Sequence, residues 1–388
     1  MTRITEAVDV APRPTPPPSV IAKSAEIKYY TASQFQLMWW KFRKHRLALI
    51  GMVILGIFVF IALFAEFLSP YTPGARTPNY LFGGPQVLHF VDAEGNFHLR
   101  PFTYALSAAM DPETFLLEVK EDTDEPWPVY FFVKGKPYKM WGLIESDIHL
   151  FGVKEGQGHL HLLGTDQLGR DILSRLLHAT RTSLTIGVVG LFISFFLGLI
   201  IGGISGFFGG SIDDVIQRFI EFIRSIPTLP LWMALAAALP RDWSPQRVYF
   251  TITILLGLLG WTHLARRVRG KLLSLREEDF VVAARIAGSS DARIIARHLL
   301  PSFLSYIIVD LSISFPYMIL AETSLSFIGL GLRAPVISWG VLLQDAQNIQ
   351  AIALYPWLFT PVAFVIISVM AFSFVGDGMR DAADPYSR

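Results

Sequence analysis

Long apolar runs limit what this chain can fold into more than any other feature of its sequence. The first run, LALIGMVILGIFVFIALFAEFL (47–68), has about 22 residues, and a helix of about 20 residues crosses a hydrocarbon layer about 30 Å thick. The run is too long, and begins too late, to be a cleaved signal peptide. Because 52% of the 388 residues are hydrophobic and only 17% are charged, the sequence predicts a membrane protein.

Five further apolar runs predict that the chain crosses the membrane six times. They cover residues 183–208, 226–239, 248–265, 303–332 and 355–375. The run 226–239 is short and contains prolines, and the run 303–332 is long and interrupted by polar residues. Helices satisfy their own backbone groups in lipid, so the predicted fold class is an all-α polytopic membrane protein with six transmembrane helices.

Basic residues predict the orientation of these helices. Lys41, Arg43, Lys44 and Arg46 precede the first run, which places the N-terminus in the cytoplasm, and an even number of crossings returns the C-terminus there. The loop 266–301 also has a basic excess and is therefore predicted to be cytoplasmic. Its basic residues are Arg266, Arg267, Arg269, Lys271, Arg276, Arg285, Arg293 and Arg297.

The segment between the first two predicted helices has a different character. Residues 72–160 contain stretches such as WPVYFFVKGKPYKMWGL (127–143), whose aromatic and β-branched residues between turn residues predict strands. We expect a β-rich extracytoplasmic insert here. Around it we expect a disordered cytoplasmic tail with a proline run (1–35), an N-terminal transmembrane helix (36–71) and a core with five transmembrane helices (161–388).

A charged stretch, REEDFVVAARIAGSS (276–290), lies in the predicted cytoplasmic loop. Phe280, Ala283 or Ala284, and Ala287 recur at helical spacing, which predicts a short helix with one small apolar face. Gly288 then supplies a position where a left-handed turn costs little. The pattern indicates a docking surface for another protein, although a basic, helical loop without a partner would look the same.

A second short helix is predicted directly after Gly288. The Ser-Ser-Asp sequence 289–291 offers side-chain oxygens to cap a helix ARIIARHLL (292–300), and Pro301 is expected to end that helix. The two helices together form a helix-turn-helix whose small residues let a partner approach closely.

The stretch VAARIAGSSDARIIARHLLP (282–301) resembles the loop signature of the membrane subunits of bacterial ATP-binding-cassette importers. That signature reads Glu-Ala-Ala, three residues, Gly, nine residues, Ile, one residue, Leu-Pro. The residues in register are Ala283, Ala284, Gly288, Leu300 and Pro301. Val282 stands where the signature has Glu, and His298 stands where it has Ile, as in the peptide-transporter branch. The resemblance implies that this loop is the coupling helix, which docks into a groove on a separate ATPase subunit.

Other segments resemble the second membrane subunit of dipeptide and oligopeptide permeases. They are 162–187, 206–231 and 321–332, and the resemblance covers roughly 36–71 and 160–388. It implies a type I importer permease fold in the bacterial inner membrane and a core that acts as a permease. The implied partners are a second homologous permease subunit, two cytoplasmic ATPase subunits that bind ATP and Mg, and an extracytoplasmic solute-binding protein. Peptides lead among the implied substrates, and related architectures also move nickel chelates, opines and sugars.

Two acidic residues lie inside the predicted fifth helix. A charge in hydrocarbon costs about 2.5 to 3.5 kcal/mol on insertion scales and therefore faces protein or water. Asp310 and Glu322 are thus candidates to line the translocation pathway, and the alternative is a hydrogen-bonded packing contact between subunits.

Two further segments have more than one interpretation. GTDQLGRDILSRLLHATRTS (164–183) suits an amphipathic helix lying in the outer membrane interface, or a cap that packs on the insert. SIPTLP (225–230) puts two prolines at the start of the third predicted helix, where either a gate or ordinary packing would explain them.

Several kinds of chemistry are not expected from this sequence. It contains no Gly-x-x-x-x-Gly-Lys-Ser/Thr loop, no Gly-x-Ser-x-Gly elbow, no His-Glu-x-x-His helix and no cysteine, so we expect a transport subunit and not an enzyme. His159 and His161 lack a third ligand nearby, so we expect neither a metal site nor a cofactor in this chain. No nucleic-acid partner is expected. The competing hypothesis is a self-sufficient secondary transporter or channel, which would show inverted repeats that this sequence lacks.

Overall fold

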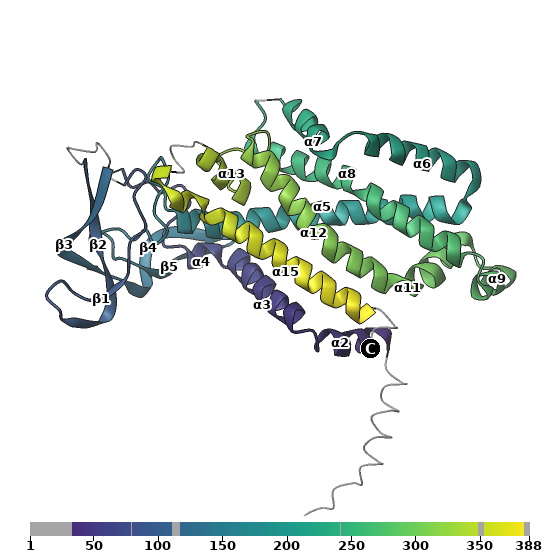
Figure 1. Ribbon diagram of the computed structural model, residues 1–388, viewed down its shortest axis with the longest axis horizontal. Helices are drawn as coiled ribbons and strands as arrows, with labels where there is room; N and C mark the ends of the chain where they lie inside the picture. The colour runs from purple at the N-terminus through teal and green to yellow at the C-terminus, as the bar shows by residue number, and fades with distance from the viewer. Residues whose placement is uncertain (1–32, 79, 111–116, 241, 348–352, 384–388) are drawn as a thin grey trace, which may run out of the picture.

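A computed structural model describes residues 33–78, 80–110, 117–240, 242–347 and 353–383. The chain forms a bundle of long helices with a group of strands at one end (Figure 1). The disordered tail predicted for residues 1–35 lies almost entirely outside the described residues.

Five helices in the described part of the chain are long and apolar enough to cross a membrane. They are α3 (Arg46–Leu63), α5 (Ile172–Phe208), α8 (Pro245–Leu275), α12 (Leu304–Phe327) and α15 (Thr360–Ala383). Glycine, small and apolar residues dominate their sequences, and their apolar side chains form the cores where the helices meet.

The third predicted helix is broken. The helix expected over 226–239 is present as α7 (Thr228–Ala237), but it is only the second half of a crossing, because α6 (Gly210–Ser225) precedes it and the pair is bent by 81° at Ile226–Pro227. Helix α5 ends near α9 and α8 begins at the opposite end, so the α6–α7 pair has to cross the bundle between them (Figure 1). The ten residues of α7 are too few to span a bilayer alone, and α6 supplies the remaining length.

Helix α5 also differs from its prediction. Residues 164–183 do not form a separate helix in the membrane interface, because α5 runs without a break from Ile172 to Phe208. The Asp171 side chain caps its start by accepting a hydrogen bond of 2.7 Å from the backbone N–H of Ser174. The first turns of α5 are buried, and Ile172 packs with Ala346, Leu358 and Phe82.

Glycines at every fourth position let α5 lie directly against α8. A Cβ atom built on Gly202 would lie 2.5 Å from the carbonyl oxygen of Ala265, and Gly198 and Gly206 meet α8 as closely. Stripes of small residues allow such close helix contacts in membranes.

We expect Gly202→Ala to destabilise the chain by about 1–3 kcal/mol, because the added methyl group has to push the two helices apart. The midpoint of thermal unfolding in detergent measures this loss. Gly203→Ala is the matched control, since a Cβ atom at Gly203 meets nothing within 4 Å. Equal midpoints for the two variants would contradict the close packing of α5 on α8.

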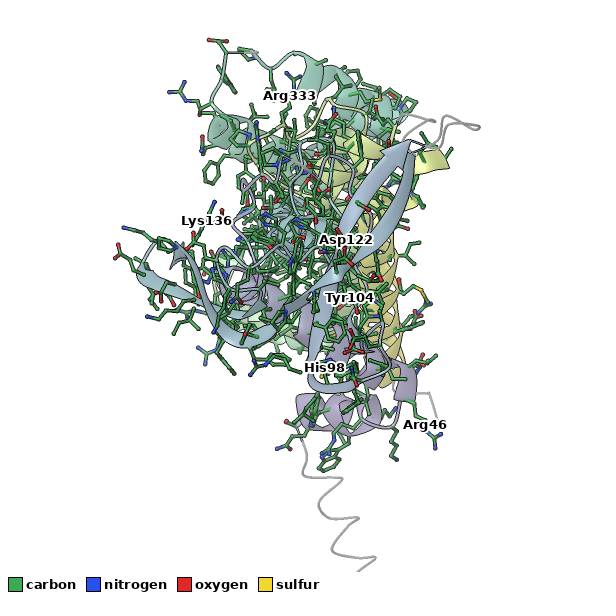
Figure 2. The ribbon with its side chains drawn as sticks, turned by 90° about the vertical axis from the view of Figure 1, so that its left-hand side faces the viewer. Arg46, His98, Tyr104, Asp122, Lys136 and Arg333 are labelled. Atoms are coloured by element: carbon green, nitrogen blue, oxygen red, sulfur yellow. The ribbon has the colours of Figure 1, made fainter. Side chains whose placement is uncertain are left out.

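Two small antiparallel sheets form the insert. The first sheet contains β1 (His89–Val91), β2 (Phe97–Met110) and β3 (Leu117–Pro128), and the second contains β4 (Tyr130–Met140) and β5 (Ile144–Gly152). Figure 2, which views the strand end, shows them as separate arms, with Lys136 on one and Tyr104 and Asp122 on the other. The strands predicted between the first two membrane helices are therefore present, and their side of the membrane stays a prediction.

Short helices complete the described chain. They are α2 (Gln34–Phe42), α4 (Ala65–Leu68), α9 (Asp279–Ile286), α10 (Asp291–Arg293), the π-helix η1 (Ile294–Leu299), α11 (Leu300–Ser302), α13 (Trp339–Gln344), and the 3₁₀ helices η2 (Asp345–Gln347) and η3 (Pro356–Phe359). Before α3, His45 lies 3.6 Å from Asp381 near the end of α15. The chain thus enters the bundle and leaves it at the same end, as an even number of crossings requires.

Candidate functional site

Helix α9 lies at the end of the bundle opposite the strands (Figure 1). One side of this eight-residue helix packs on the bundle through Val281, which is fully buried among apolar side chains of α5, α8, η1 and α12. The guanidinium group of Arg285 also lies 5.8 Å from the ring centroid of Phe207. A helix this short is not stable alone, so these contacts fix its position.

The C-terminus of α9 is a Schellman motif built on Gly288. The backbone N–H of Ser289 donates to the carbonyl of Ala284 and that of Gly288 donates to Arg285, both at 3.0 Å. Gly288 has a φ of +81°, which side-chain-bearing residues rarely adopt. The left-handed turn predicted at Gly288 is confirmed.

The face of α9 that points away from the bundle is apolar. Val282, Ala283 and Ile286 are exposed there, and Ile286 keeps 82% of its surface accessible. The five signature residues therefore do not share one surface: Ala283, Gly288 and Pro301 are exposed, whereas Ala284 and Leu300 pack partly on the core. Val282, which departs from the signature, belongs to the exposed strip.

The second helix of the loop differs from its prediction. Ser290 is in the N-cap position of α10 but its side chain makes no capping hydrogen bond. Residues 294–299 then form a π-helix, and Ile294 and Leu299 are buried in the same core as Val281. Pro301 lies at the start of α11, and the chain turns into α12 at Phe303.

Glu322 is fully buried in the middle of the bundle. Its carboxylate accepts hydrogen bonds from the hydroxyl groups of Ser326 at 2.7 Å, Ser338 at 2.6 Å and Ser183 at 3.4 Å. These serines lie on α12, before α13 and on α5, so the carboxylate joins three segments of one chain. These hydrogen bonds are packing contacts of the kind considered as the alternative for Glu322, but they lie within one subunit and not between two. A role of Glu322 in the translocation pathway stays a prediction.

Asp310 is also buried, but its partner is partly exposed. This carboxylate is buried on α12 and forms an ion pair with Arg267 of α8, whose side chain is 45% exposed. The pair joins the two helices near the loop end of the bundle. A role of Asp310 in the pathway also stays a prediction.

A buried ionic cluster at the strand end was missed by the sequence reasoning. Asp166, before α5, accepts a hydrogen bond from Nε of Arg170 at 2.6 Å and pairs with Arg175, and both Asp166 and Arg175 are nearly inaccessible. Asp345 of η2 lies 3.6 Å from Arg175. Burial raises the pKa of Asp345, and the nearby Arg175 opposes this effect. The signal was the charge-rich TDQLGRD (165–171), which directly precedes the first residue of α5.

His161 contacts a carboxylate in the same region. Its Nδ1 lies 3.0 Å from Oδ1 of Asp171, the residue that caps α5. Among the described residues, no group of three or more His, Asp or Glu side chains is arranged to hold a metal ion.

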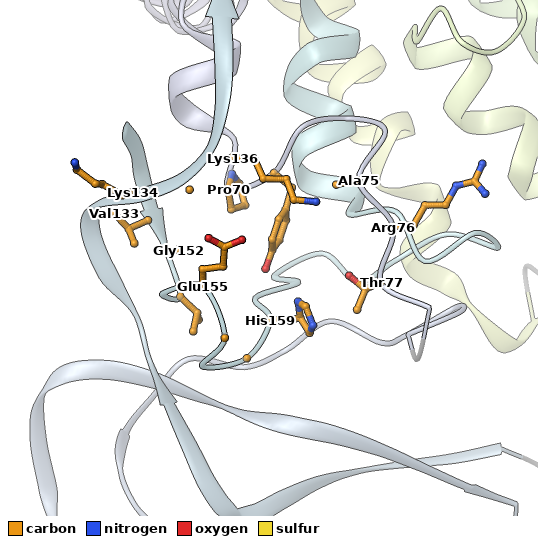
Figure 3. A pocket seen from close by; sticks show the side chains of 15 residues that line it. Pro70, Ala75, Arg76, Thr77, Val133, Lys134, Lys136, Gly152, Glu155 and His159 are labelled. Atoms are coloured by element: carbon orange, nitrogen blue, oxygen red, sulfur yellow. The ribbon is translucent and has the colours of Figure 1, made fainter. Parts of the chain in front are cut away.

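A cavity of about 280 Å³ lies where β4 and the loop after β5 meet residues 70–77, the loop that follows α4. Figure 3 shows the side chains that line it. Arg76, Lys136, Glu155 and His159 line it together with apolar residues such as Val133, so its surface mixes polar and apolar groups. Burial lowers the pKa of His159, and nearby His161 and Lys136 act in the same direction, which keeps this imidazole neutral at pH 7.

Comparison with known proteins identifies the family of this chain. Residues 195–388 match the family described as binding-protein-dependent transport system inner membrane component, and residues 33–85 match the N-terminal TM domain of oligopeptide transport permease C. The oligopeptide transport system permease protein OppC of Bacillus subtilis (strain 168) is 38% identical over 59% of this chain and 72% of its own length. The chain belongs to the family of binding-protein-dependent inner membrane transport components.

The alignments with related proteins differ in how much of this inner membrane component they include. The dipeptide transport system permease protein DppC of Lactococcus lactis subsp. cremoris (strain MG1363) is 32% identical over 91% of both chains, so its alignment includes most of the insert. A solved structure of the MetNI methionine ABC transporter in inward-facing conformations covers 54% of this chain and 96% of its own, at 19% identity and a TM-score of 0.41.

Proposed function

We propose that this chain is the membrane-spanning permease subunit of an ATP-binding-cassette importer, with a type I permease fold, that takes up peptides or similar small solutes. Family membership and the relatives named oligopeptide and dipeptide permeases support this class of transporter. The observation that carries the mechanism is α9, an exposed apolar helix fixed at one end of the bundle.

Helix α9 is the proposed contact with the ATPase subunits. Its outer strip of Val282, Ala283 and Ile286 offers a small apolar surface, and Val281 ties the helix to α5, α8 and α12. A displacement of α9 by a partner would therefore reach the membrane helices directly. Two sites are coupled when both bias one element between two arrangements, and a rigid helix docked in a partner groove meets this requirement.

Helix α6 is the proposed contact with a second, homologous permease subunit. It exposes Ile212, Val215, Phe219 and Phe222 beside charged side chains that include an exposed Arg218–Glu221 pair at 3.4 Å. Lipid does not tolerate these charges, and water does not favour four exposed apolar side chains in one strip. A second protein subunit would cover the apolar side chains, and a partly aqueous pathway beside it would solvate the charged ones.

The proposed orientation places both termini and the 266–301 loop in the cytoplasm of a bacterium, with the chain in the inner membrane. The basic residues 41–46 and the end of α15 lie at the same end of the bundle as α9, which agrees with the positive-inside tendency. The insert then lies on the outer side, where a solute-binding protein delivers its cargo. We keep Asp310 and Glu322 as candidates for the pathway and favour Asp310 for its half-exposed partner Arg267.

The deciding experiment reconstitutes the chain with its candidate second permease subunit, ATPase subunits and binding protein in proteoliposomes. We expect uptake of a labelled peptide only when ATP, Mg and the binding protein are all present, because this chain supplies the path and the partners supply the energy. An ATPase subunit without its catalytic carboxylate is the control and should abolish uptake. Uptake driven by an ion gradient without ATP would show that the chain is a secondary transporter.

A further inference from the structure

The turn between β4 and β5 exposes a group of large apolar side chains. Leu143 is 84% exposed, Ile144 is 63% exposed and Trp141 is 51% exposed. Residues 140–144 are called the hairpin tip below. Contiguous apolar side chains on a surface usually mark a place where another molecule binds or where lipid begins.

The hairpin tip is attached to the end of a membrane-spanning helix. The indole Nε1 of Trp141 donates a hydrogen bond of 3.0 Å to the carbonyl oxygen of Leu63, the last residue of α3. The guanidinium group of Arg181 lies 4.2 Å from the Trp141 ring centroid and also pairs with Glu66 at 2.6 Å. These contacts hold the tip at the depth where α3 leaves the membrane.

The exposed surface of the tip continues the lipid-facing surface of α3. Phe60, Leu63 and Phe64 are exposed at this end of the helix, and the rings of Phe60 and Phe64 lie 4.9 Å apart. Only 17% of the apolar window of α3 is buried in the bundle, so most of this helix faces outward. The tip therefore adds apolar side chains at the level where the span ends.

The chemistry of the tip suits the boundary between headgroups and acyl chains. Tryptophan is enriched at this depth because its ring is apolar and its N–H is polar. Directly behind the tip, Lys139 and Glu145 form an exposed ion pair of 2.7 Å, which places charges at headgroup level. Trp141 and Gly142 have φ angles of +53° and +71°, a turn that favours Asn-Gly. The contacts of the Trp141 side chain offset this unfavourable backbone geometry.

We propose that the hairpin tip inserts into the bilayer interface at the end of α3 opposite the basic residues 41–46, and that it anchors the insert to lipid. The ligand is the boundary region of the bilayer, where Leu143 and Ile144 contact acyl chains and Trp141 lies among the headgroups. The anchor sets the distance of the β4–β5 arm from the membrane.

The absence of cysteine from the sequence allows a direct test. Leu143→Cys is labelled with a fluorophore in the full chain, purified with its accompanying subunits and placed in phosphatidylcholine nanodiscs. Leu99→Cys is the matched control, because Leu99 lies in the same insert, on β2, and is 90% exposed. We expect a quencher carried on the acyl chain to remove most of the Leu143→Cys emission and little of the Leu99→Cys emission. Iodide in the water should do the reverse.

Two results would overturn the proposal. Equal quenching of both labels by iodide would place the tip in water. Protection of the Leu143→Cys label from both quenchers would mean that protein covers the tip, either the second permease subunit or the solute-binding protein. A label at Ile144→Cys gives an independent reading of depth, and the exposure of both side chains makes the substitutions compatible with folding.

Discussion

Gly288→Trp is expected to abolish ATP-driven uptake while the protein still inserts and folds. Gly288 ends α9 with a φ of +81°, and a Cβ atom built there meets nothing within 4 Å. The substitution therefore causes no clash inside the chain. Its effect arises from the left-handed backbone position and from a large side chain beside the exposed strip of α9. Uptake and ATP hydrolysis by the reconstituted transporter measure the result.

A smaller substitution separates these two causes. Gly288→Ala adds no bulk at the docking surface, and the left-handed conformation costs an alanine about 1–2 kcal/mol. This cost weakens the turn after α9 but leaves its exposed strip uncovered, so we expect partial uptake from Gly288→Ala and none from Gly288→Trp. Gly56→Trp is the control for bulk, since Gly56 lies in α3 with open space around it. ATP-driven uptake that is unchanged in Gly288→Trp would refute α9 as the docking helix.

The sequence predicts most of the membrane-spanning segments because length and apolarity decide them. α3, α8 and α15 fall within or around the expected runs, and α12 ends five residues before its run does. The third crossing was predicted poorly because α6 carries charges along its length and only the apolar residues after it resemble a span. Hydropathy alone does not identify a crossing in which charged residues alternate with apolar ones, as they do along α6.

Helix α9 shows a different limit. Phe280, Ala283 and Ala287 recur at helical spacing, but so do Val281 and Ala284, and in the structure Val281 is buried and Ala284 packs partly on the core. Because Val281 and Val282 are adjacent and equally apolar, the sequence does not tell which of them faces the bundle. The packing of the other helices decides it. Gly288 was predictable because its role depends on backbone conformation alone.

The start of α5 was misjudged for a related reason. Charged residues before an apolar run usually indicate a solvated or interfacial segment, and here Asp166, Arg175 and Asp345 satisfy one another below the surface. Asp345 lies 179 residues from Asp166 in the chain, so no local pattern could pair them. Long-range ion pairs of this kind need the fold before they can be recognised.

Asp166→Ala is expected to cause the largest loss of stability among single substitutions at the strand end, about 3–5 kcal/mol, because it leaves Arg175 buried without its closest carboxylate. The variant also removes the acceptor for the backbone N–H groups of Leu168 at 2.8 Å and Arg170 at 3.0 Å. The midpoint of thermal unfolding in detergent should fall accordingly. Asp166→Asn keeps an acceptor for these two N–H groups and removes the charge, so it separates the two contributions.

The matched control for Asp166→Ala breaks an ion pair that is exposed on the protein surface. Lys139 and Glu145 lie 2.7 Å apart, with 63% and 74% of their side-chain surfaces exposed. Exposed pairs contribute about 0–1 kcal/mol, so Lys139→Ala should leave the midpoint nearly unchanged. A buried Arg175 without its partner carries a cost, so equal unfolding temperatures for Asp166→Ala and Lys139→Ala would show that the cluster does not stabilise the junction of α5 with η2.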